Sequence, residues 1–238
     1  MKTRILVTGA TGFLGKALVP MLRKNYEVYT LSTSFQKDPR HFQIDLRKPF
    51  RLFLKFDAVI HLAAKINYTW LPWIHNFREL KKVNVDGTKN LINGCETKYF
   101  IYASTLSVYD LKNRENMEKN KIRPRCFYAL TKYQGELVCL RLSRIKKFKL
   151  LIVRFPMIYD FEEPRMETRM FLKFLPFLKF FRPLLLRKKF NVIERKEAVK
   201  LILKFLEERR DGVIDIKGNV ISIAKFLAMI DKFKKATK

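Results

Sequence analysis

The chain has 238 residues, of which 48% are hydrophobic, enough for one large folded domain with a sizeable core. Its net charge of +28 favours anionic ligands or surfaces, although a lysine-rich composition spread over solvated faces would give the same value. The scattered Cys95, Cys126 and Cys139 argue against a disulfide framework or a zinc site and for a cytoplasmic location, and we expect no signal peptide or membrane span.

Strand and helix patterns alternate along most of the chain. Short apolar runs predict strands at 3–8, 27–32, 41–45, 57–63, 98–104 and 149–155. Amphipathic patterns predict helices that begin near 13 and that cover 76–97 and 126–147. Such alternation is typical of an α/β domain whose mostly parallel sheet is covered by helices on both faces.

The pattern changes after Arg154. Residues 160–190 look irregular and contain three prolines. A helix at about 195–209, a short strand in 212–218 and a final helix at 222–236 follow. We expect residues 157–238 to form a small lobe packed on the sheet rather than an independent domain.

Gly9, Gly12 and Gly15 lie between the first predicted strand and the first helix, in the segment TGATGFLG. In that place the first glycine permits a tight turn, the second close approach to a pyrophosphate, and the third close helix–strand packing. The N-terminus of the helix would then face the phosphates. A glycine turn without any ligand is the alternative, so the rest of the chain has to decide.

Further motifs recur along the chain and together resemble the extended short-chain dehydrogenases/reductases, the NAD-dependent epimerase/dehydratase group. The matching pieces are TGATGFLG (8–15), IDL (44–46), DAVIHLAA (57–64), NVDGTKNLI (84–92), FIYASTLSVYD (100–110), YALTK (128–132) and VRFPMIYD (153–160). The resemblance covers nearly the whole chain. It implies a Rossmann-like doubly wound parallel sheet, with residues 1–156 as an NAD(P)-binding domain and 157–238 as a shortened substrate-binding lobe.

Tyr128 and Lys132 are four residues apart on a predicted helix and therefore share one face. A nearby ammonium favours the phenolate form of the tyrosine, which could then exchange a proton with a substrate hydroxyl. The resemblance implies that Lys132 also holds the nicotinamide ribose and that Thr105 is the catalytic hydroxyl that orients the substrate. Ser104 is the fallback, and both hydroxyls could instead cap the strand end.

The resemblance also implies which residues contact the dinucleotide. They are Gly9, Thr11, Gly12, Phe13, Leu14, Gly15, Ser32, Thr33, Asp45, Leu46, Leu62, Ala63, Ala64, Asn84, Ser104, Tyr128, Lys132 and Phe155. Members that prefer NAD often carry an acid at the end of the second strand, and LSTSFQK (31–37) has none. Lys37 or Arg40 could meet a 2′-phosphate, so the sequence favours NADP over NAD.

These residues lead us to expect an NAD(P)-dependent oxidoreductase or epimerase. Hydride would move between the nicotinamide and a carbinol carbon, and a nucleotide-activated sugar is the substrate that the resemblance implies. Leu106 and Ser107 follow Thr105 in place of the acid pair of dehydratases, which disfavours water elimination. Two alternatives remain: a reductase of a lipid or sterol-like alcohol at a membrane surface, and a non-catalytic nucleotide-binding scaffold of a membrane complex or RNA.

Residues 170–190, MFLKFLPFLKFFRPLLLRKKF, are dense in aromatic, leucine and basic side chains. They could be core of the lobe, a contact with an anionic membrane, or, least favoured, a nucleic-acid surface.

The resemblance further implies a homodimer formed through helices 76–97 and 126–147. His61 is expected to be a packed strand residue and Cys126 an ordinary neighbour of the pocket. His41 and His75 lack partners at metal-ligand spacing, so no metal is predicted.

Overall fold

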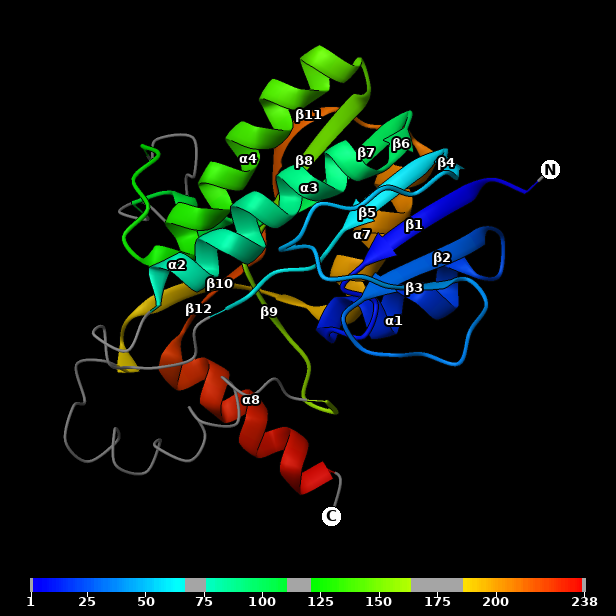
Figure 1. The fold of residues 1–238 in the computed structure, drawn as a ribbon. Helices are drawn as coiled ribbons and strands as arrows, with labels where there is room; N and C mark the ends of the chain where they lie inside the picture. Colours follow the sequence, from blue (N-terminus) through cyan, green and yellow to red (C-terminus); the bar gives the residue numbers. More distant parts are fainter. Residues whose placement is uncertain (1, 67–75, 111–120, 164–185, 237–238) are drawn as a thin grey trace.

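A computed structural model describes residues 2–66, 76–110, 121–163 and 186–236 (Figure 1). Its centre is a seven-stranded sheet in the order β11-β8-β7-β5-β1-β2-β3. The strands are β3 (His41–Gln43), β2 (Glu27–Ser32), β1 (Arg4–Thr8), β5 (Ala58–His61), β7 (Tyr99–Thr105), β8 (Lys149–Phe155) and β11 (Gly212–Asp215). Every pairing between neighbours in this sheet is parallel.

The order of the strands reverses at β1. From β1 the chain builds outward through β2 to β3, then returns to the other side of β1 and continues through β5, β7 and β8. At such a reversal the loops after the two central strands diverge and open a crevice at their carboxyl ends. The doubly wound α/β fold expected from the sequence is therefore confirmed.

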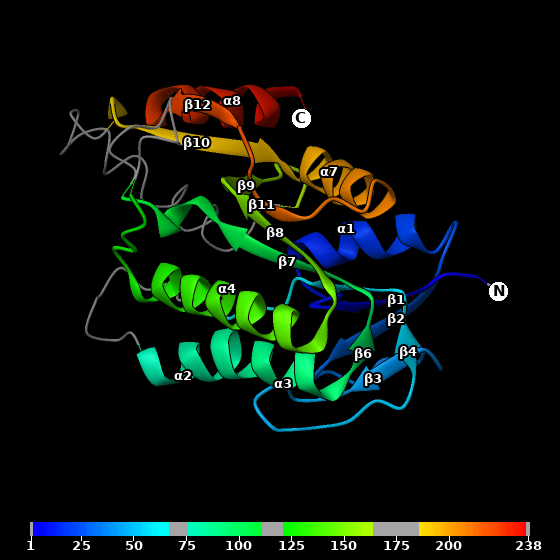
Figure 2. The same cartoon turned by 90° about the horizontal axis from the view of Figure 1, so that it is seen from above.

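Helices cover both faces of the sheet, as Figure 2 shows. On one face lie α1 (Phe13–Leu22) and α7 (Arg195–Glu207), which contact each other. On the other lie α2 (Phe77–Lys81), a π-helical turn η2 (Lys82–Asp86), α3 (Gly87–Gly94) and the long α4 (Phe127–Lys146). Right-handed crossovers between parallel strands require this placement.

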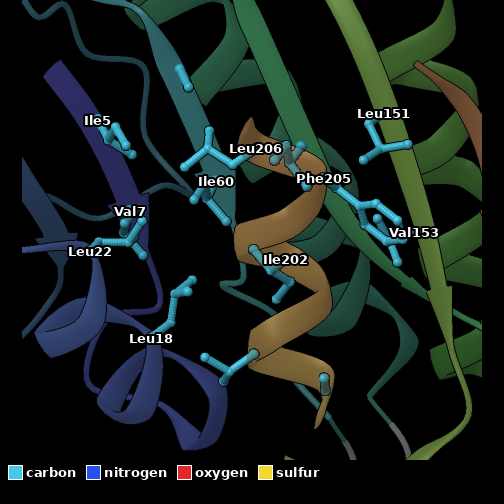
Figure 3. Close-up of a cluster of buried hydrophobic side chains, with 14 of the residues drawn as sticks. Ile5, Val7, Leu18, Leu22, Ile60, Leu151, Val153, Ile202, Phe205 and Leu206 are labelled. Carbon is cyan, nitrogen blue, oxygen red and sulfur yellow. The ribbon is translucent and has the colours of Figure 1, made fainter. Parts of the chain in front are cut away.

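Each face of the sheet has its own apolar core, because successive strand residues point to opposite faces. Figure 3 shows the core under α1 and α7. Its labelled members are Ile5, Val7, Leu18, Leu22, Ile60, Leu151, Val153, Ile202, Phe205 and Leu206. Leu6, Val59 and Phe100 alternate with them and pack under α3 and α4. The continuous apolar runs of the central strands are explained by this burial on both sides.

The tail of the chain contributes to both the main sheet and a smaller one. In the smaller sheet β10 (Lys189–Glu194) pairs parallel with β9 (Met157–Tyr159) and antiparallel with β12 (Asn219–Ser222), and α8 (Ile223–Ala236) packs on it. β11 instead joins the main sheet beside β8. The short pair β4 (Lys55–Phe56) and β6 (Glu96–Thr97) completes the strands described. The division at residue 156 stays a prediction.

The sequence did not predict β9, β10 or β12, because their partners are brought together only by the fold. Most of the stretch 170–190 lies outside the described residues, but its end, Leu186 and Phe190, packs with the core under α8.

No helix in the described part of the chain is long and apolar enough to cross a bilayer. The described residues also contain no cluster of three His, Cys, Asp or Glu side chains that would hold a metal ion.

Candidate functional site

A cavity of about 880 Å³ opens at the carboxyl ends of the central strands. Its size lies in the range of small-molecule and cofactor pockets. The residues predicted from the sequence that line it are Gly9, Thr11, Gly12, Phe13, Leu14, Gly15, Ser32, Thr33, Asp45, Leu46, Leu62, Ala63, Ala64, Ser104, Thr105, Tyr128 and Phe155. Of the predicted set, Lys132 and Asn84 are not part of its wall. The fold thus gathers most of the predicted residues around one space, and their individual roles stay predictions.

The three glycines of the turn after β1 differ in what surrounds them. Gly9 has a φ of +70°, and a Cβ on it would lie 2.7 Å from the Ala63 nitrogen. A Cβ on Gly15 would lie 2.2 Å from the Gly9 oxygen. Among the described residues, a Cβ on Gly12 would approach only Gly9, at 3.1 Å from its oxygen and 4.0 Å from its carbonyl carbon. Packing of the protein therefore requires glycine at positions 9 and 15, whereas the space beside Gly12 has room for a ligand.

That room lies at the N-terminus of α1. No side chain in the described part of the protein caps this helix, and its first turn contains no acid. The backbone N–H groups of the first turn and the helix dipole then favour an anion at this place. The glycine turn and the first turn of α1, together called the dinucleotide cradle below, therefore fit the pyrophosphate of a dinucleotide.

The end of β2 carries hydroxyls rather than an acid. Ser32 and Thr33 line the cavity, and Ser32 Oγ donates to the Ser34 carbonyl oxygen at 3.1 Å. Of the basic residues that follow, Arg40 is paired with Glu27 at 3.6 Å. Lys37 follows in the loop after β2, but it lines a neighbouring pocket together with Arg40 rather than this cavity.

Asp45 lines the cavity and is paired with a neighbouring side chain. The Arg47 guanidinium donates to its carboxylate from Nε at 3.0 Å and from Nη2 at 2.8 Å, and these bonds hold the pKa of Asp45 below its usual value. Arg47 Nη1 also lies 3.5 Å from Glu79 Oε2, and Lys65 Nζ lies 3.8 Å from the same oxygen. Arg47 and Lys65 both line the cavity and were not predicted, although each directly follows a matched motif.

Thr105 and Tyr128 reach the same cavity from different elements. Thr105 ends β7 and caps the short 3₁₀ turn η3 (Leu106–Val108), where its Oγ1 accepts from the Ser107 N–H at 3.2 Å. Its hydroxyl also donates to Ser107 Oγ at 3.2 Å. Tyr128 lies in the first turn of α4, after the exposed N-cap residue Cys126. Ser107 lines the cavity as well and was missed by the sequence analysis.

Lys132 lies one turn beyond Tyr128 but is buried behind the cavity wall, with 2% of its surface exposed. Its Nζ stands 4.0 Å from the centre of the Tyr102 ring, a cation–π contact. Burial lowers the pKa of Lys132 to about 8, against the opposing effects of Cys139 and Glu136. The ammonium of Lys132 therefore lies in the interior of the protein, next to the Tyr102 ring.

Asn84 is also buried behind the cavity, where it ties three segments together. Its Oδ1 accepts from the Lys65 N–H at 2.8 Å, and its Nδ2 donates to the Lys65 carbonyl at 3.0 Å. Nδ2 also donates to Thr131 Oγ1 at 3.0 Å, and that hydroxyl donates to the Tyr128 carbonyl at 2.9 Å. Asn84 thus connects the segment after β5 to the first turn of α4.

His61, at the end of β5, is a packed residue with a defined tautomer. Thr88 Oγ1 donates to the Asn84 carbonyl at 2.8 Å, so it accepts from His61 Nε2 at 2.9 Å. Nδ1 is then the acceptor for Thr8 Oγ1 at 2.6 Å. Burial lowers the pKa of His61 to about 3, so the ring is neutral at physiological pH. The ring links β1, β5 and α3 beneath the glycine turn.

A family model for the NAD dependent epimerase/dehydratase family matches residues 5–175. The chain belongs to this family. The match begins in β1 and covers the glycine turn, the cavity residues Thr105 and Tyr128, and all of β8.

Two relatives of known description share about a quarter of the aligned residues with this chain. An uncharacterized UDP-glucose epimerase, YtcB, from Bacillus subtilis is 27% identical over 180 residues, which cover 66% of this chain and 57% of that protein. A UDP-N-acetyl-alpha-D-glucosaminuronate decarboxylase from Bacillus cytotoxicus is 27% identical over 181 residues, or 67% of this chain and 56% of that protein. The matches thus span little more than half the length of these relatives.

Among solved structures, the fold is similar to UDP-glucuronic acid 4-epimerase from Bacillus cereus in complex with NAD. The TM-score is 0.77 at 24% identity, and the match covers 98% of this chain and 83% of that one. At this identity the likeness shows the fold.

Proposed function

We propose that the protein is an NAD(P)-dependent oxidoreductase or epimerase that acts on a carbinol carbon of a nucleotide-activated sugar. The observation that carries this proposal is the single cavity that joins the glycine turn to Thr105 and Tyr128. The relatives support it, since they are named for UDP-sugar reactions and a similar structure holds NAD.

In this proposal the dinucleotide lies along the carboxyl ends of the strands. Gly12 and the first turn of α1 would hold the pyrophosphate, Ser32 and Thr33 the adenosine ribose, and Asp45 the adenine. Ala63 lines the cavity at the start of the segment after β5 and would lie beneath the nicotinamide half. The chemistry that this cofactor supplies when bound is the acceptance or donation of hydride.

The protein's own groups manage the proton. Tyr128 would take the proton of the substrate hydroxyl as the carbon loses hydride, and return it in the reverse direction. Thr105 would orient the substrate oxygen toward it through a hydrogen bond. The buried ammonium of Lys132 would favour the phenolate from below, because an opposite charge nearby stabilises the ionised form.

We also propose that the protein prefers NADP over NAD. Ser32 leaves no carboxylate at the end of β2 to repel a 2′-phosphate, and Lys37 follows it in the adjoining loop, from which it would have to reach the phosphate. Replacing Ser32 with Asp would introduce that repulsion. We expect Ser32→Asp to shift the ratio of NADPH to NADH affinity toward NADH; an unchanged ratio would contradict this assignment.

The proposed function is tested in two stages. Fluorescence titration with NADPH and NADH, at physiological salt to suppress nonspecific anion binding, tests the dinucleotide site. Turnover is then measured with UDP-glucose and UDP-glucuronic acid, by absorbance at the reduced cofactor's band and by chromatography of the sugar products. Binding of neither dinucleotide would refute the proposal as a whole, and binding without any turnover would refute its catalytic part.

A second candidate is a non-catalytic dinucleotide-binding protein. The burial of Lys132 behind the cavity wall favours it, since a catalytic lysine that holds the nicotinamide ribose has to reach the cofactor. This candidate predicts dinucleotide binding that the charge-removing change Lys132→Met leaves unaltered. The catalytic proposal predicts that the same variant turns over its substrate more slowly, because the phenolate of Tyr128 loses the charge that supports it.

Three further predictions from the sequence stand as proposals of partner and location. A contact with an anionic membrane would use residues 170–190, most of which lie outside the described residues, and the lipid-alcohol alternative depends on it. A homodimer would use the helical segments 76–97 and 126–147, and Leu137 and Ile145 in the second of them are exposed. Sedimentation with anionic liposomes and light scattering test these two, and cell fractionation tests the expected cytoplasmic location.

A further inference from the structure

Glu136 is a buried carboxylate that the proposed chemistry does not use. It is 1% exposed and lies on α4, one turn beyond Lys132 and two turns beyond Tyr128, on the same helix face. Its Oε1 accepts from Ser104 Oγ at 2.5 Å and from Arg154 Nε at 3.0 Å, and its Oε2 accepts from Arg154 Nη2 at 2.6 Å. Three hydrogen bonds therefore fix the orientation of a charge that would be costly to bury alone.

The bond between Ser104 and Glu136 joins the two elements that carry the proposed chemistry. Ser104 directly precedes Thr105 at the end of β7, and Glu136 shares α4 with Tyr128. Sliding of the helix along the strand end would alter the separation of Thr105 and Tyr128, and it would have to break this bond. Misplacement of reacting groups by roughly 1 Å can reduce a rate by about 100-fold.

Arg154 connects Glu136 to a second carboxylate. It lies on β8, next to the cavity residue Phe155, and its Nη1 donates to the Tyr109 hydroxyl at 2.6 Å. That hydroxyl in turn donates to Asp215 Oδ2 at 2.6 Å, and Arg154 Nη1 lies 3.6 Å from Asp215 Oδ1. Burial and the bond to Asp215 raise the pKa of Tyr109 to about 12, so the bridging phenol is neutral. The guanidinium therefore lies between two carboxylates.

Asp215 comes from the tail of the chain and is far in sequence from the other members. It is on β11, which adds to the edge of the main sheet with Asp215 in register with Arg154. Among the described residues, none after Ile158 lines the cavity. Any effect of Asp215 on the site must therefore pass through Arg154 or Tyr109.

We propose that Glu136 is a positioning residue that keeps Tyr128 and Thr105 in register, and that Asp215 supports it through Arg154. The tail thereby takes part in the active site without touching it. This inference rests on the proposed function, because positioning matters only if Thr105 and Tyr128 act together.

The test compares Glu136→Gln and Asp215→Asn with Glu96→Gln, which removes the exposed carboxylate that pairs with Lys55. We expect kcat of Glu136→Gln to fall by about 10- to 100-fold, while the NADPH dissociation constant stays within about twofold. Asp215→Asn is expected to lower kcat less, and Glu96→Gln to leave it unchanged. The double variant should be no slower than Glu136→Gln alone, because both changes act on one network.

Wild-type kcat in a folded Asp215→Asn variant would overturn the inference, and so would a double variant whose losses multiply. Thermal unfolding of every variant shows which of them fold. If Glu136→Gln does not fold, the kcat of Asp215→Asn alone tests the inference. These outcomes differ from a loss of folding, which would lower NADPH binding together with kcat.

Failure of the proposed function itself has a separate signature. If the wild-type protein turns over no nucleotide sugar, hydrogen–deuterium exchange still measures the positioning. Asp215→Asn should then raise exchange selectively in residues 100–105 and 127–132, relative to β1 and β2. Unchanged exchange, or an equal increase throughout the sheet, would overturn the inference.

Discussion

Gly12 and Gly15 provide the sharpest test of the dinucleotide cradle, because the structure separates their roles. Gly12 has φ −80° and ψ 178°, which alanine adopts without strain, and its added Cβ would make one close contact, 3.1 Å from the Gly9 oxygen. We expect Gly12→Ala to change the free energy of unfolding by less than about 1 kcal/mol. In Gly15→Ala the Cβ would lie 2.2 Å from the Gly9 oxygen and 2.6 Å from the Ala10 Cα. Overpacking of this kind costs about 3 kcal/mol, or roughly 6–12 °C in Tm.

The two variants should therefore show opposite defects. The methyl group of Gly12→Ala would stand where the pyrophosphate approaches the first turn of α1. Loss of one hydrogen bond to a charged group costs about 1.5–3 kcal/mol, so we expect the NADPH dissociation constant to rise roughly 10- to 100-fold. Thermal unfolding and fluorescence titration measure both effects. Wild-type affinity in Gly12→Ala would refute the reasoning about the cradle, and a wild-type Tm in Gly15→Ala would refute the packing argument.

Three further predictions concern catalysis, pH and the core. Tyr128→Phe should abolish turnover and leave NADPH binding intact, since only the proton is lost; a folded variant that no longer binds would contradict the role. The pKa of His61 is about 3 when folded and ordinarily 6.5, so the unfolded state binds the extra proton and stability falls as pH drops below 6.5. As the pH falls through this range, the free energy of unfolding of His61→Gln should decrease by about 1.4 kcal/mol less per pH unit than that of the wild type. Urea unfolding at a series of pH values measures this difference. Ile202→Ala, in the fully buried core under α7, should cost about 2–5 kcal/mol in the same assay, and a smaller loss would indicate that the site collapses.

Local sequence patterns were sufficient to predict the alternation of strands and helices. The apolar run at 57–63 and the run at 149–155 became β5 and β8, and the segment TGATGFLG became the turn into α1. Patterns of this kind depend on the neighbouring residues alone, because side-chain periodicity and glycine conformation act within a few residues. The family membership also follows from such motifs, since they keep their order along the chain.

Pairings between distant segments could not be predicted in this way. The short strand within 212–218 was expected, but its place beside β8 depends on which edge of the sheet the fold leaves open. β10 begins at the end of the stretch expected to be irregular, 160–190, and is a strand because β9 and β12 flank it. Short strands take their stability from partners rather than from propensity, so their sequences carry little signal.

The sequence by itself determined the fold class and most of the residues around the cavity, because motif and periodicity are local properties. Only the tertiary structure decided that Lys132 and Asn84 lie behind the cavity wall rather than in it. The tertiary structure likewise decided that Glu136, Arg154 and Asp215 meet. The burial of a charge and the identity of its partner depend on strands and helices that are distant in sequence, and no local pattern records them.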